Sequence, residues 1–273
     1  MTIRLRDKPS LATFLDHCSR ADGVDRTVVA KSAVESLAFL RRSADGRAGG
    51  SRALEDRWYA SLAAGAPDYG VYDTDEYLGE LWACWITYSR KYLLGAFGAR
   101  FASGGLLRAL GPVESVLDLG CGVGYACAAL RAELPHARVV GTNIRGTNQW
   151  RIAQTLAVES GFALVDALDG VGPVDVVFAS EFFEHLPRPV AYLGEVVERT
   201  TPRALLVANT FNAASIGHFR RYDVDGAART GTETGRAFDA ALRRFGYEKV
   251  KTGLWNQRPA FWTRAAAASG SLW

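Results

Sequence analysis

Apolar residues recur at three- and four-residue spacing in the N-terminal third of the chain. From Thr27 to Arg42 they fall on one face of a helix. Ser10 is a suitable cap for an earlier helix that runs through Arg20, and Arg52 to Ala64 has a helical pattern as well. The glycines and small polar residues of 43–51 predict a loop between them. The pattern therefore predicts a helical N-terminal extension.

A longer helix is predicted after an irregular segment that is rich in tyrosine. Asp73, followed three residues later by Glu76, approximates a capping box with Asp as the N-cap. The helix should run from about Thr74 to Phe97. One side of it carries a stripe of large residues: Leu78, Leu81, Trp82, Trp85, Tyr88 and Tyr92.

From residue 115 onward, strand patterns alternate with helix patterns. Strands are expected near 115–119, 138–142, 162–165, 174–179, 203–209, 247–252 and 259–263. Helices are expected at 124–134, 147–160, 189–200 and 233–245. This alternation predicts an α/β fold with a doubly wound, mostly parallel, seven-stranded sheet. The last two strands are joined by Gly253 to Pro259 only, which is too short for a parallel crossover, so they should form an antiparallel hairpin.

Composition bounds the class of protein without fixing its function. The chain has 273 residues, which fits one large domain or one domain with a sizeable extension. Its 32 basic and 29 acidic residues give a net charge of +3. Because positive and negative charges are nearly equal in number, the net charge gives no general electrostatic reason to expect a nucleic-acid or membrane partner.

Cysteine usage and hydropathy bear on the compartment. The four cysteines, Cys18, Cys84, Cys121 and Cys127, form no CxxC pair. This argues against a zinc site or a disulfide framework and favours reduced thiols in a cytoplasmic protein. The first residues, MTIRLRDKPS, lead into no long apolar core, and no stretch of about 18 uncharged apolar residues occurs. We therefore expect neither a signal peptide nor a transmembrane helix.

The segment VLDLGCGVGYACAAL, residues 116–130, joins a strand to a helix through three glycines. Glycine permits positive φ and a close ligand approach, and the helix N-terminus offers free N–H groups. A nucleotide-like ligand is the default at this edge of an open α/β sheet. The spacing is GxGxG rather than the dinucleotide pattern GxGxxG. Asp118, two residues before the first glycine, would repel a pyrophosphate but suits a ligand that carries an ammonium group.

Two segments resemble class I S-adenosylmethionine (SAM)-dependent methyltransferases. DLGCGVG after an apolar strand resembles motif I, and DVVFASEFFEHLPRP resembles the segment that ends the fourth strand in that family. The resemblance covers about residues 85–264, with some likeness to the cyclopropane synthases and to natural-product C- and O-methyltransferases. It implies a Rossmann-like methyltransferase fold with SAM as cofactor, an N-terminal helical lid over 1–100 and a SAM-binding core over 101–273.

The resemblance also assigns residues to the cofactor. TYSRKYL resembles a segment whose Tyr and Ser contact the SAM carboxylate, here Tyr88 and Ser89. Asn143 stands near the ribose, where many members have Asp or Glu. Asp166 would accept from the adenine amino group, with Asp169 as the competing register. The predicted cofactor-binding residues are Tyr88, Ser89, Asp118, Gly120, Cys121, Gly122, Gly124, Asn143, Ile144, Gln149, Asp166, Ala167 and Glu181.

Methyl transfer is an in-line displacement in which the protein mainly orients the reactants, so deprotonation of the acceptor is a separate task. His185 and Tyr222 are the catalytic candidates. His185 could act as a general base or simply order its loop. HFRRYDVDG, residues 218–226, should lie over the crevice mouth, and its Arg220 and Arg221 could bind a substrate anion or remain on the surface. The sequence presents no acidic cluster of the metal-dependent type, so we expect no metal.

The leading hypothesis is a methyltransferase that acts on O, N or C of a small molecule, in specialised metabolism. A second reading is a nucleic-acid or protein methyltransferase with a local basic face, which the even charge balance disfavours. A third is a SAM-binding protein that transfers no methyl group. We expect a small-molecule partner and no membrane partner; the oligomeric state stays open, with a homodimer as one option.

Overall fold

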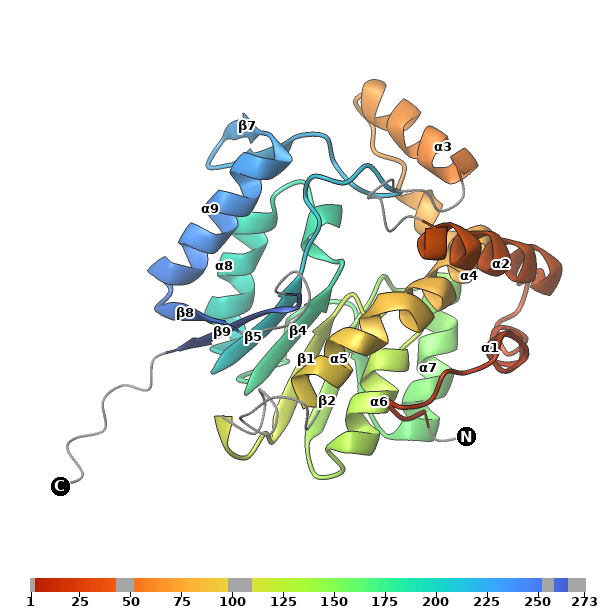
Figure 1. The fold of residues 1–273 in the computed structure, drawn as a ribbon, viewed down its shortest axis with the longest axis horizontal. Coiled ribbons are helices and arrows are strands. Elements are labelled where there is room, and N and C mark those ends of the chain that lie inside the picture. Colours follow the sequence, from red (N-terminus) through yellow and green to blue (C-terminus); the bar gives the residue numbers. More distant parts are fainter. Residues whose placement is uncertain (1–2, 43–51, 98–109, 252–257, 265–273) are drawn as a thin grey trace.

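Seven strands form a single sheet with helices on both faces (Figure 1). The computed structural model describes residues 3–42, 52–97, 110–251 and 258–264. The strand order is β3-β2-β1-β4-β5-β9-β8. The first five strands in this order are parallel to one another, and β9 is antiparallel to both of its neighbours, β5 and β8. The structure confirms the predicted doubly wound sheet and its antiparallel final hairpin.

The elements of this sheet layer follow the predicted ranges, with ends that differ by at most two residues. The strands are β1 (Ser115–Leu119), β2 (Arg138–Thr142), β3 (Ala163–Val165), β4 (Val176–Ser180), β5 (Ala204–Ala208), β8 (Tyr247–Val250) and β9 (Ala260–Arg264). The helices are α6 (Tyr125–Glu133), α7 (Asn148–Ser160), α8 (Pro189–Thr200) and α9 (Gly231–Arg244). Thr230 and Glu233 form a capping box, so α9 begins two residues earlier than its hydrophobic pattern suggests.

The hydrophobic core lies on both faces of the sheet because the strands are apolar on both sides. Along β1, Val116 packs into the cluster that contains the residues of α6, whereas Leu117 and Leu119 pack into the cluster formed with α8 and α9. This is the alternation expected for successive residues of a strand. Packing on both faces of the sheet therefore holds the carboxyl ends of β1, β4 and β5 in place.

The N-terminal extension consists of α1 (Leu11–Cys18), α2 (Arg26–Arg42), α3 (Arg52–Ala63), η2 (Tyr69–Asp73), α4 (Asp75–Cys84), η3 (Trp85–Ser89) and α5 (Arg90–Phe97). Ser10 caps α1 as predicted, since its side chain accepts from the N–H of Thr13. Helices α2 and α4 pack closely at Gly79, where a Cβ atom would lie 2.5 Å from the backbone nitrogen of Ala33. No helix in the described part of the chain is long and apolar enough to cross a membrane.

The single long helix expected over 74–97 is interrupted. Between α4 and α5, the segment Trp85–Ser89 forms a turn of π-helix. The predicted cap is also wrong by one residue, because Thr74, not Asp73, accepts from the N–H of Tyr77 at 3.2 Å. Asp73 instead accepts from the N–H of Asn148, the first residue of α7, at 2.6 Å. The extension is therefore anchored directly to the sheet layer.

A small hairpin that the sequence analysis did not predict follows β5. Strands β6 (Tyr222–Val224) and β7 (Ala227–Arg229) are antiparallel and form their own two-stranded sheet. Asp225 and Gly226 join them with φ values of 53° and 78°. Positive φ at both central residues marks a type I′ turn, and Asp-Gly is its sequence signal. Residues 218–226 thus continue into regular structure rather than forming only a loop.

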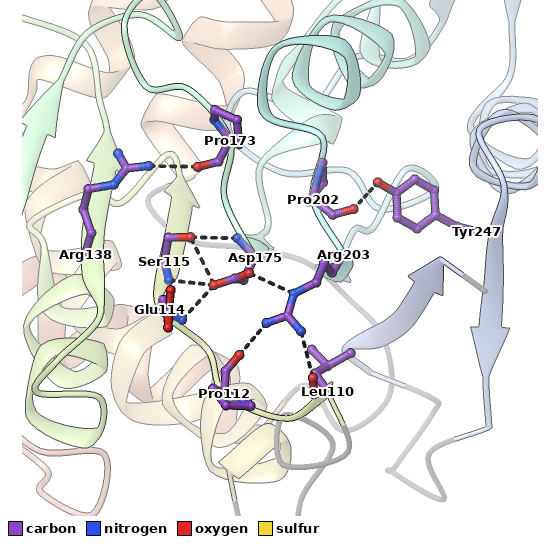
Figure 2. A network of polar contacts seen from close by, with 10 residues as sticks. All are labelled: Leu110, Pro112, Glu114, Ser115, Arg138, Pro173, Asp175, Pro202, Arg203 and Tyr247. Carbon is purple, nitrogen blue, oxygen red and sulfur yellow. Dashed lines mark hydrogen bonds and ion pairs between the residues drawn. The ribbon is translucent and has the colours of Figure 1, made fainter. Parts of the chain in front are cut away.

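A polar network braces the amino ends of β1, β4 and β5, at the sheet edge opposite the glycine turn (Figure 2). Asp175 accepts from the N–H groups of Glu114 and Ser115, at 2.7 and 3.0 Å, and from Nε of Arg203 at 2.8 Å. Arg203 also donates to the carbonyl of Leu110 at 2.8 Å. These bonds lower the pKa of Asp175, although its burial opposes them.

Candidate functional site

The glycine loop forms the turn between β1 and α6, and all three of its glycines have positive φ. The values are 66° at Gly120, 54° at Gly122 and 87° at Gly124. The loop is tied to the end of β2, because the N–H of Gly120 donates to Oγ1 of Thr142 at 3.0 Å and the N–H of Cys121 donates to its carbonyl at 2.9 Å. The predicted binding turn is thus a fixed element at the carboxyl edge of the sheet.

Asp118 lies beneath this loop and is only 2% exposed. The thiol of Cys127, on α6, donates to its carboxyl oxygen at 3.3 Å. Burial raises the pKa of Asp118 to about 7, and the bond from Cys127 only partly offsets it. The side chain therefore faces the helix that follows the loop, and its role toward a cofactor stays a prediction.

Three predicted cofactor residues follow β2. Asn143 donates through Nδ2 to the carbonyl of Gly122 at 2.6 Å and accepts through Oδ1 from the N–H of Ile144 at 2.8 Å. Ile144 itself is exposed. Gln149 is buried at the start of α7, and its Nε2 lies 3.4 Å from the carbonyl of Tyr72. Asn143 thereby links the end of β2 to the glycine loop, and Gln149 links α7 to the extension.

Asp166 and Asp169, the two candidates for the adenine contact, each form an ion pair with an arginine at the surface. Asp166 accepts from Nε and Nη2 of Arg145, the latter at 3.1 Å, and this contact lowers its pKa. Ala167 is exposed beside it. Asp169 pairs with Arg199 of α8. Asp166 follows β3 at the carboxyl edge of the sheet, which is the position that the prediction required.

The N-terminal extension covers the glycine loop. Leu81 of α4 lies over Gly122, where a Cβ atom would meet its side chain at 3.4 Å. Ser89 accepts a hydrogen bond from Ser180, the last residue of β4, at 3.2 Å. Tyr88, its neighbour on η3, packs against the main hydrophobic core. Ser89 is thus tied to the carboxyl end of β4, its contact with a cofactor stays a prediction, and Tyr88 has the packing role that its helical stripe suggested.

His185 is a neutral imidazole at this edge. Its Nδ1 lies 2.9 Å from the hydroxyl of Tyr72, and its ring meets that of His218 edge-on with centroids 4.8 Å apart. Burial lowers the pKa of His185 well below its usual value, and the charge of His218 would lower it further. Tyr222, the other catalytic candidate, is fully buried, and its hydroxyl donates to the carbonyl of Glu184 at 3.3 Å.

An acid pair that the sequence analysis did not group together lies next to these rings. Glu181 has a positive φ of 52° at the end of β4, and Oγ1 of Thr210 donates to its Oε2 at 3.0 Å. Glu184 is completely buried, and its Oε1 accepts from the N–H of Thr210 at 2.5 Å. Burial raises the pKa of both carboxyls, and for Glu184 the charge of Glu181 raises it further. The sequence indicated Glu181 and the EHLP segment but gave no sign of Thr210.

Aromatic residues of the extension divide between core and site. Trp82 and Trp85 belong to the main core. Tyr72 and Tyr77 meet edge-on with centroids 5.2 Å apart, and Tyr72 also contacts the ring of His185. Trp58 of α3 donates through Nε1 to the carbonyl of His218 at 2.7 Å. Tyr72 is therefore the aromatic residue of the extension that reaches the catalytic candidate directly.

The comparisons with known proteins agree with this geometry. A family model described as a methyltransferase domain matches residues 89–252. A tocopherol O-methyltransferase of Arabidopsis thaliana is 28% identical over 106 residues, which are 36% of this chain and 30% of the relative. A trans-aconitate 2-methyltransferase of Azoarcus sp. (strain BH72) is 34% identical over 98 residues, which are 36% of this chain and 39% of the relative. The chain thus spans about a third of the length of the curated relatives that it matches.

Among solved structures, the mitomycin 7-O-methyltransferase MmcR aligns with 96% of this chain and 74% of its own. Its sequence identity is 15% and its TM-score is 0.41. The N-terminal domain of EvdMO1, solved with SAH bound, aligns with 59% of this chain at 16% identity and a TM-score of 0.40. Likenesses this remote carry no argument about function.

Proposed function

The chain belongs to the methyltransferase domain family, and from this premise we propose that it transfers the methyl group of SAM to a small-molecule acceptor. SAM is the cofactor of this family, and it supplies a methyl group activated by a positively charged sulfur. The observation that carries the proposal is the arrangement of the glycine turn, Ser89 and His185 at the carboxyl edge of β1 and β4. The groups that we propose for binding and for catalysis thus lie at the same edge of the sheet.

The residues around the glycine turn fit a ligand of this chemistry. The turn has three left-handed glycines followed by the N-terminus of α6, so it offers a narrow cradle and free N–H groups. Asn143 and Gln149 add neutral amides, and Glu181 adds a carboxylate. Such a lining favours a zwitterionic or cationic ligand without phosphate. The glycine turn, Asn143, Gln149 and Ser89 are the groups that we propose hold SAM, and the Glu181 carboxylate lies beside them.

We propose His185 as the group that accepts the acceptor's proton, with Tyr72 as its positioning residue. A neutral imidazole has one ring nitrogen that donates and one that accepts. When Nδ1 donates to the Tyr72 hydroxyl, Nε2 keeps its lone pair for the proton. The lowered pKa keeps His185 neutral but also makes it a weak base. An acceptor that ionises readily, such as a phenol or a carboxylic acid, therefore suits the site best.

The distribution of arginines supports a small acceptor over a nucleic acid. Arg90 is buried and donates to the carbonyl of Leu5, and Arg220 stacks on the ring of Tyr59. Arg100 and Arg108 lie outside the described residues. Of the candidates for a basic face that the structure describes (Arg90, Lys91, Arg220 and Arg221), Lys91 and Arg221 are exposed, and two separate cations make a poor phosphate-binding face. The four cysteines are free, which supports the proposed cytoplasmic location.

The first test is calorimetric titration of the purified chain with SAM and, separately, with NADH. Micromolar binding of SAM without binding of NADH is expected. Turnover is then measured as S-adenosylhomocysteine released with a panel of phenols and di- and tricarboxylic acids, trans-aconitate included. A folded protein that binds no SAM would overturn the proposal. Binding without turnover of any small acceptor, but with salt-dependent binding of RNA or DNA, would instead favour the nucleic-acid reading.

A further inference from the structure

Glu181, Glu184 and His218 come from different segments, yet each directs one potential ligand atom into the same small space. Glu181 follows β4, Glu184 is on η5 (Phe183–His185), and His218 lies between β5 and β6. One oxygen of each carboxyl and one imidazole nitrogen all lie within 4.8 Å of one another. We propose that these three residues bind a divalent first-row transition-metal ion, with Zn²⁺ as the reference.

Each of the three side chains is oriented by a partner outside the group. The N–H of Thr210 holds Oε1 of Glu184, and its hydroxyl holds Oε2 of Glu181. Nδ1 of His218 lies 3.0 Å from the carbonyl of Ala213, which can only accept, so this nitrogen carries a proton. A histidine that donates one nitrogen to a backbone carbonyl, beside carboxylates held by hydrogen bonds, is the usual outer arrangement of a metal site. The backbone of Thr210 also interacts with the His218 ring, so an ion at the second nitrogen would replace that interaction.

An independent observation at Glu184 favours a positively charged ligand. Glu184 is 0% exposed, and its Oε2 has no hydrogen-bond donor among the described residues, except where the carboxyl pair with Glu181 shares a proton. A buried carboxylate oxygen without a donor is costly, because it has lost its water and gained nothing in return. Arg258 places one positive charge near Glu181. If both carboxyls are ionised, their two negative charges are balanced by the single positive charge of Arg258. A further positive charge at Oε2 of Glu184 would complete the balance.

The donor set indicates which kind of ion would bind. Imidazole nitrogen and carboxylate oxygen are both ligand types that zinc binds, and three protein ligands leave a further position to water, as in catalytic zinc sites. Ligand atoms at roughly 2.0–2.2 Å from a tetrahedral ion lie about 3.3–3.6 Å apart, so side-chain rotations of about 1 Å would close the present spacing. Mg²⁺ prefers oxygen ligands in an octahedron and retains its waters, so it fits this set less well.

A shared proton between the two carboxyls is the competing explanation. Glu184→Gln separates the two. The glutamine keeps an oxygen for the Thr210 N–H and offers an amide hydrogen to Glu181, so it imitates the protonated pair but removes a metal ligand. Glu80→Gln is the matched control, since Glu80 is also a carboxyl with a buried oxygen that lacks a partner, but it lies on α4 outside the group.

The experiment uses the full chain after dialysis against a chelator. Zn²⁺ is titrated by calorimetry, bound zinc per chain is counted by mass spectrometry, and Co²⁺ is added to record its absorption spectrum. We expect one ion per chain, affinity at least tenfold weaker in Glu184→Gln and in His218→Gln, and no change in Glu80→Gln. Circular dichroism checks that each variant is folded, and Glu181→Gln replaces any variant that is not.

Two results would overturn the inference. One is failure of the parent chain to take up a stoichiometric ion, in which case a shared proton accounts for the pair. The other is binding by Glu184→Gln and His218→Gln that equals that of the parent, which would put the ion elsewhere. Any part of the ion in methyl transfer rests on the proposed function, but its binding does not. Because no SAM or acceptor enters the titration, failure here is distinguishable from failure of the proposed activity.

Discussion

The hydroxyl of Tyr72 lies 2.9 Å from Nδ1 of His185, and this contact joins the N-terminal extension to the carboxyl edge of the sheet. The two residues are 113 positions apart in the chain. Tyr72 comes from η2, which is held by Trp58 on one side, while His185 ends the short helix after β4. If this edge is where the acceptor binds, the extension both covers the site and sets the orientation of its imidazole.

His185→Ala should lower the turnover number about 10²-fold or more, which is the scale of lost general-base catalysis. The affinity for SAM should change less than twofold, because the substitution removes no cofactor contact. Calorimetry and S-adenosylhomocysteine release measure the two quantities separately. Turnover within a few-fold of the parent would mean that His185 only orders its loop.

Tyr72→Phe tests positioning rather than chemistry. Loss of the hydroxyl frees the imidazole to adopt either tautomer, so kcat should fall about tenfold while KM stays nearly constant. The pH–rate profile should also move, since the hydrogen bond no longer favours one protonation state of His185. Tyr69→Phe is the control, because Tyr69 stacks on Tyr72 at 6.3 Å but is exposed. Equal effects of the two changes would contradict a specific role for Tyr72.

Asp118 predicts a pH dependence of stability in the ligand-free protein. Its pKa is raised by burial to about 7 in the folded chain, against 3.8 for the ordinary value. The folded state therefore binds more protons than the unfolded state between these limits. The stability that Asp118 contributes is fully present below about pH 4 and is lost as the pH rises through about 7. Asp118→Asn removes this dependence, so its free energy of unfolding relative to the parent should rise by up to about 4 kcal/mol over that range.

The same substitution tests the cofactor assignment. A cationic ligand near the loop would favour ionised Asp118, so SAM binding by the parent should release protons near pH 6, detectable by calorimetry in buffers of different ionisation enthalpy. Asp118→Asn should weaken SAM binding by about 1–3 kcal/mol, the scale of a hydrogen bond to a charged group. An unchanged affinity, with no proton release in the parent, would leave Asp118 as a buried support of α6.

Much of the fold could be predicted from the chain because local patterns determine it. The alternation of strands and helices fixes the sheet, and the short final connection requires an antiparallel pair. The hairpin at Asp225 and Gly226 was predictable in principle, since Asp-Gly is the signal for the turn that forms there. The π-turn at Trp85–Ser89 was not, because an unbroken helical stripe runs through it.

The site was only partly predictable, for a different physical reason. The glycine turn and its neighbours lie in contiguous motifs, so their positions follow from strand order. Thr210 looks like an ordinary loop residue in the sequence and reaches the site only through tertiary packing. Tyr72 and His218 could be named as candidates from the sequence, but their contacts with His185 also depend on tertiary packing. The burial of Asp118 under Cys127 depends likewise on how α6 folds back over β1. The sequence pattern indicates an acidic residue before the glycines, but it does not indicate that burial raises the pKa of that residue.

Gly120 and Gly146 provide a matched pair for the glycine loop. Both have positive φ, 66° and 86°, so alanine at either position adopts a conformation that L-residues disfavour. At Gly120 a Cβ atom would also lie 2.5 Å from the ring of Phe182, whereas at Gly146 no atom lies within 4 Å. Gly120→Ala should therefore cost about 1–3 kcal/mol more in the free energy of unfolding than Gly146→Ala.

Chemical denaturation of both glycine variants measures this difference. In the Phe182→Ala background, Gly120→Ala should cost about as much as Gly146→Ala costs in the parent, because the atoms that the new Cβ meets are gone. Similar destabilisation by the two single substitutions would mean that backbone strain alone governs the loop and that Phe182 moves aside freely.

Asp175 should stabilise the fold at the edge of the sheet opposite the glycine turn. It accepts from two backbone N–H groups and from Arg203, and its side chain is only 22% exposed. Asp175→Asn should lower the free energy of unfolding at pH 7 by about 2–3 kcal/mol, since hydrogen bonds to a charged acceptor are lost. Asp169→Asn is the control: Asp169 also pairs with an arginine, but its side chain is 80% exposed, so its loss should cost well under 1 kcal/mol.

The pH dependence of the Asp175 effect has a definite sign. Its pKa is lower in the folded chain than the usual value, so the unfolded state binds more protons as the pH falls. The stabilisation is present above the ordinary pKa of about 4 and is lost as the pH falls through the lower folded value. Denaturation at pH 7 and at pH 3 should thus show a smaller gap between parent and Asp175→Asn in acid. A gap that is constant with pH would mean that the shape of Asp175 matters there and its charge does not.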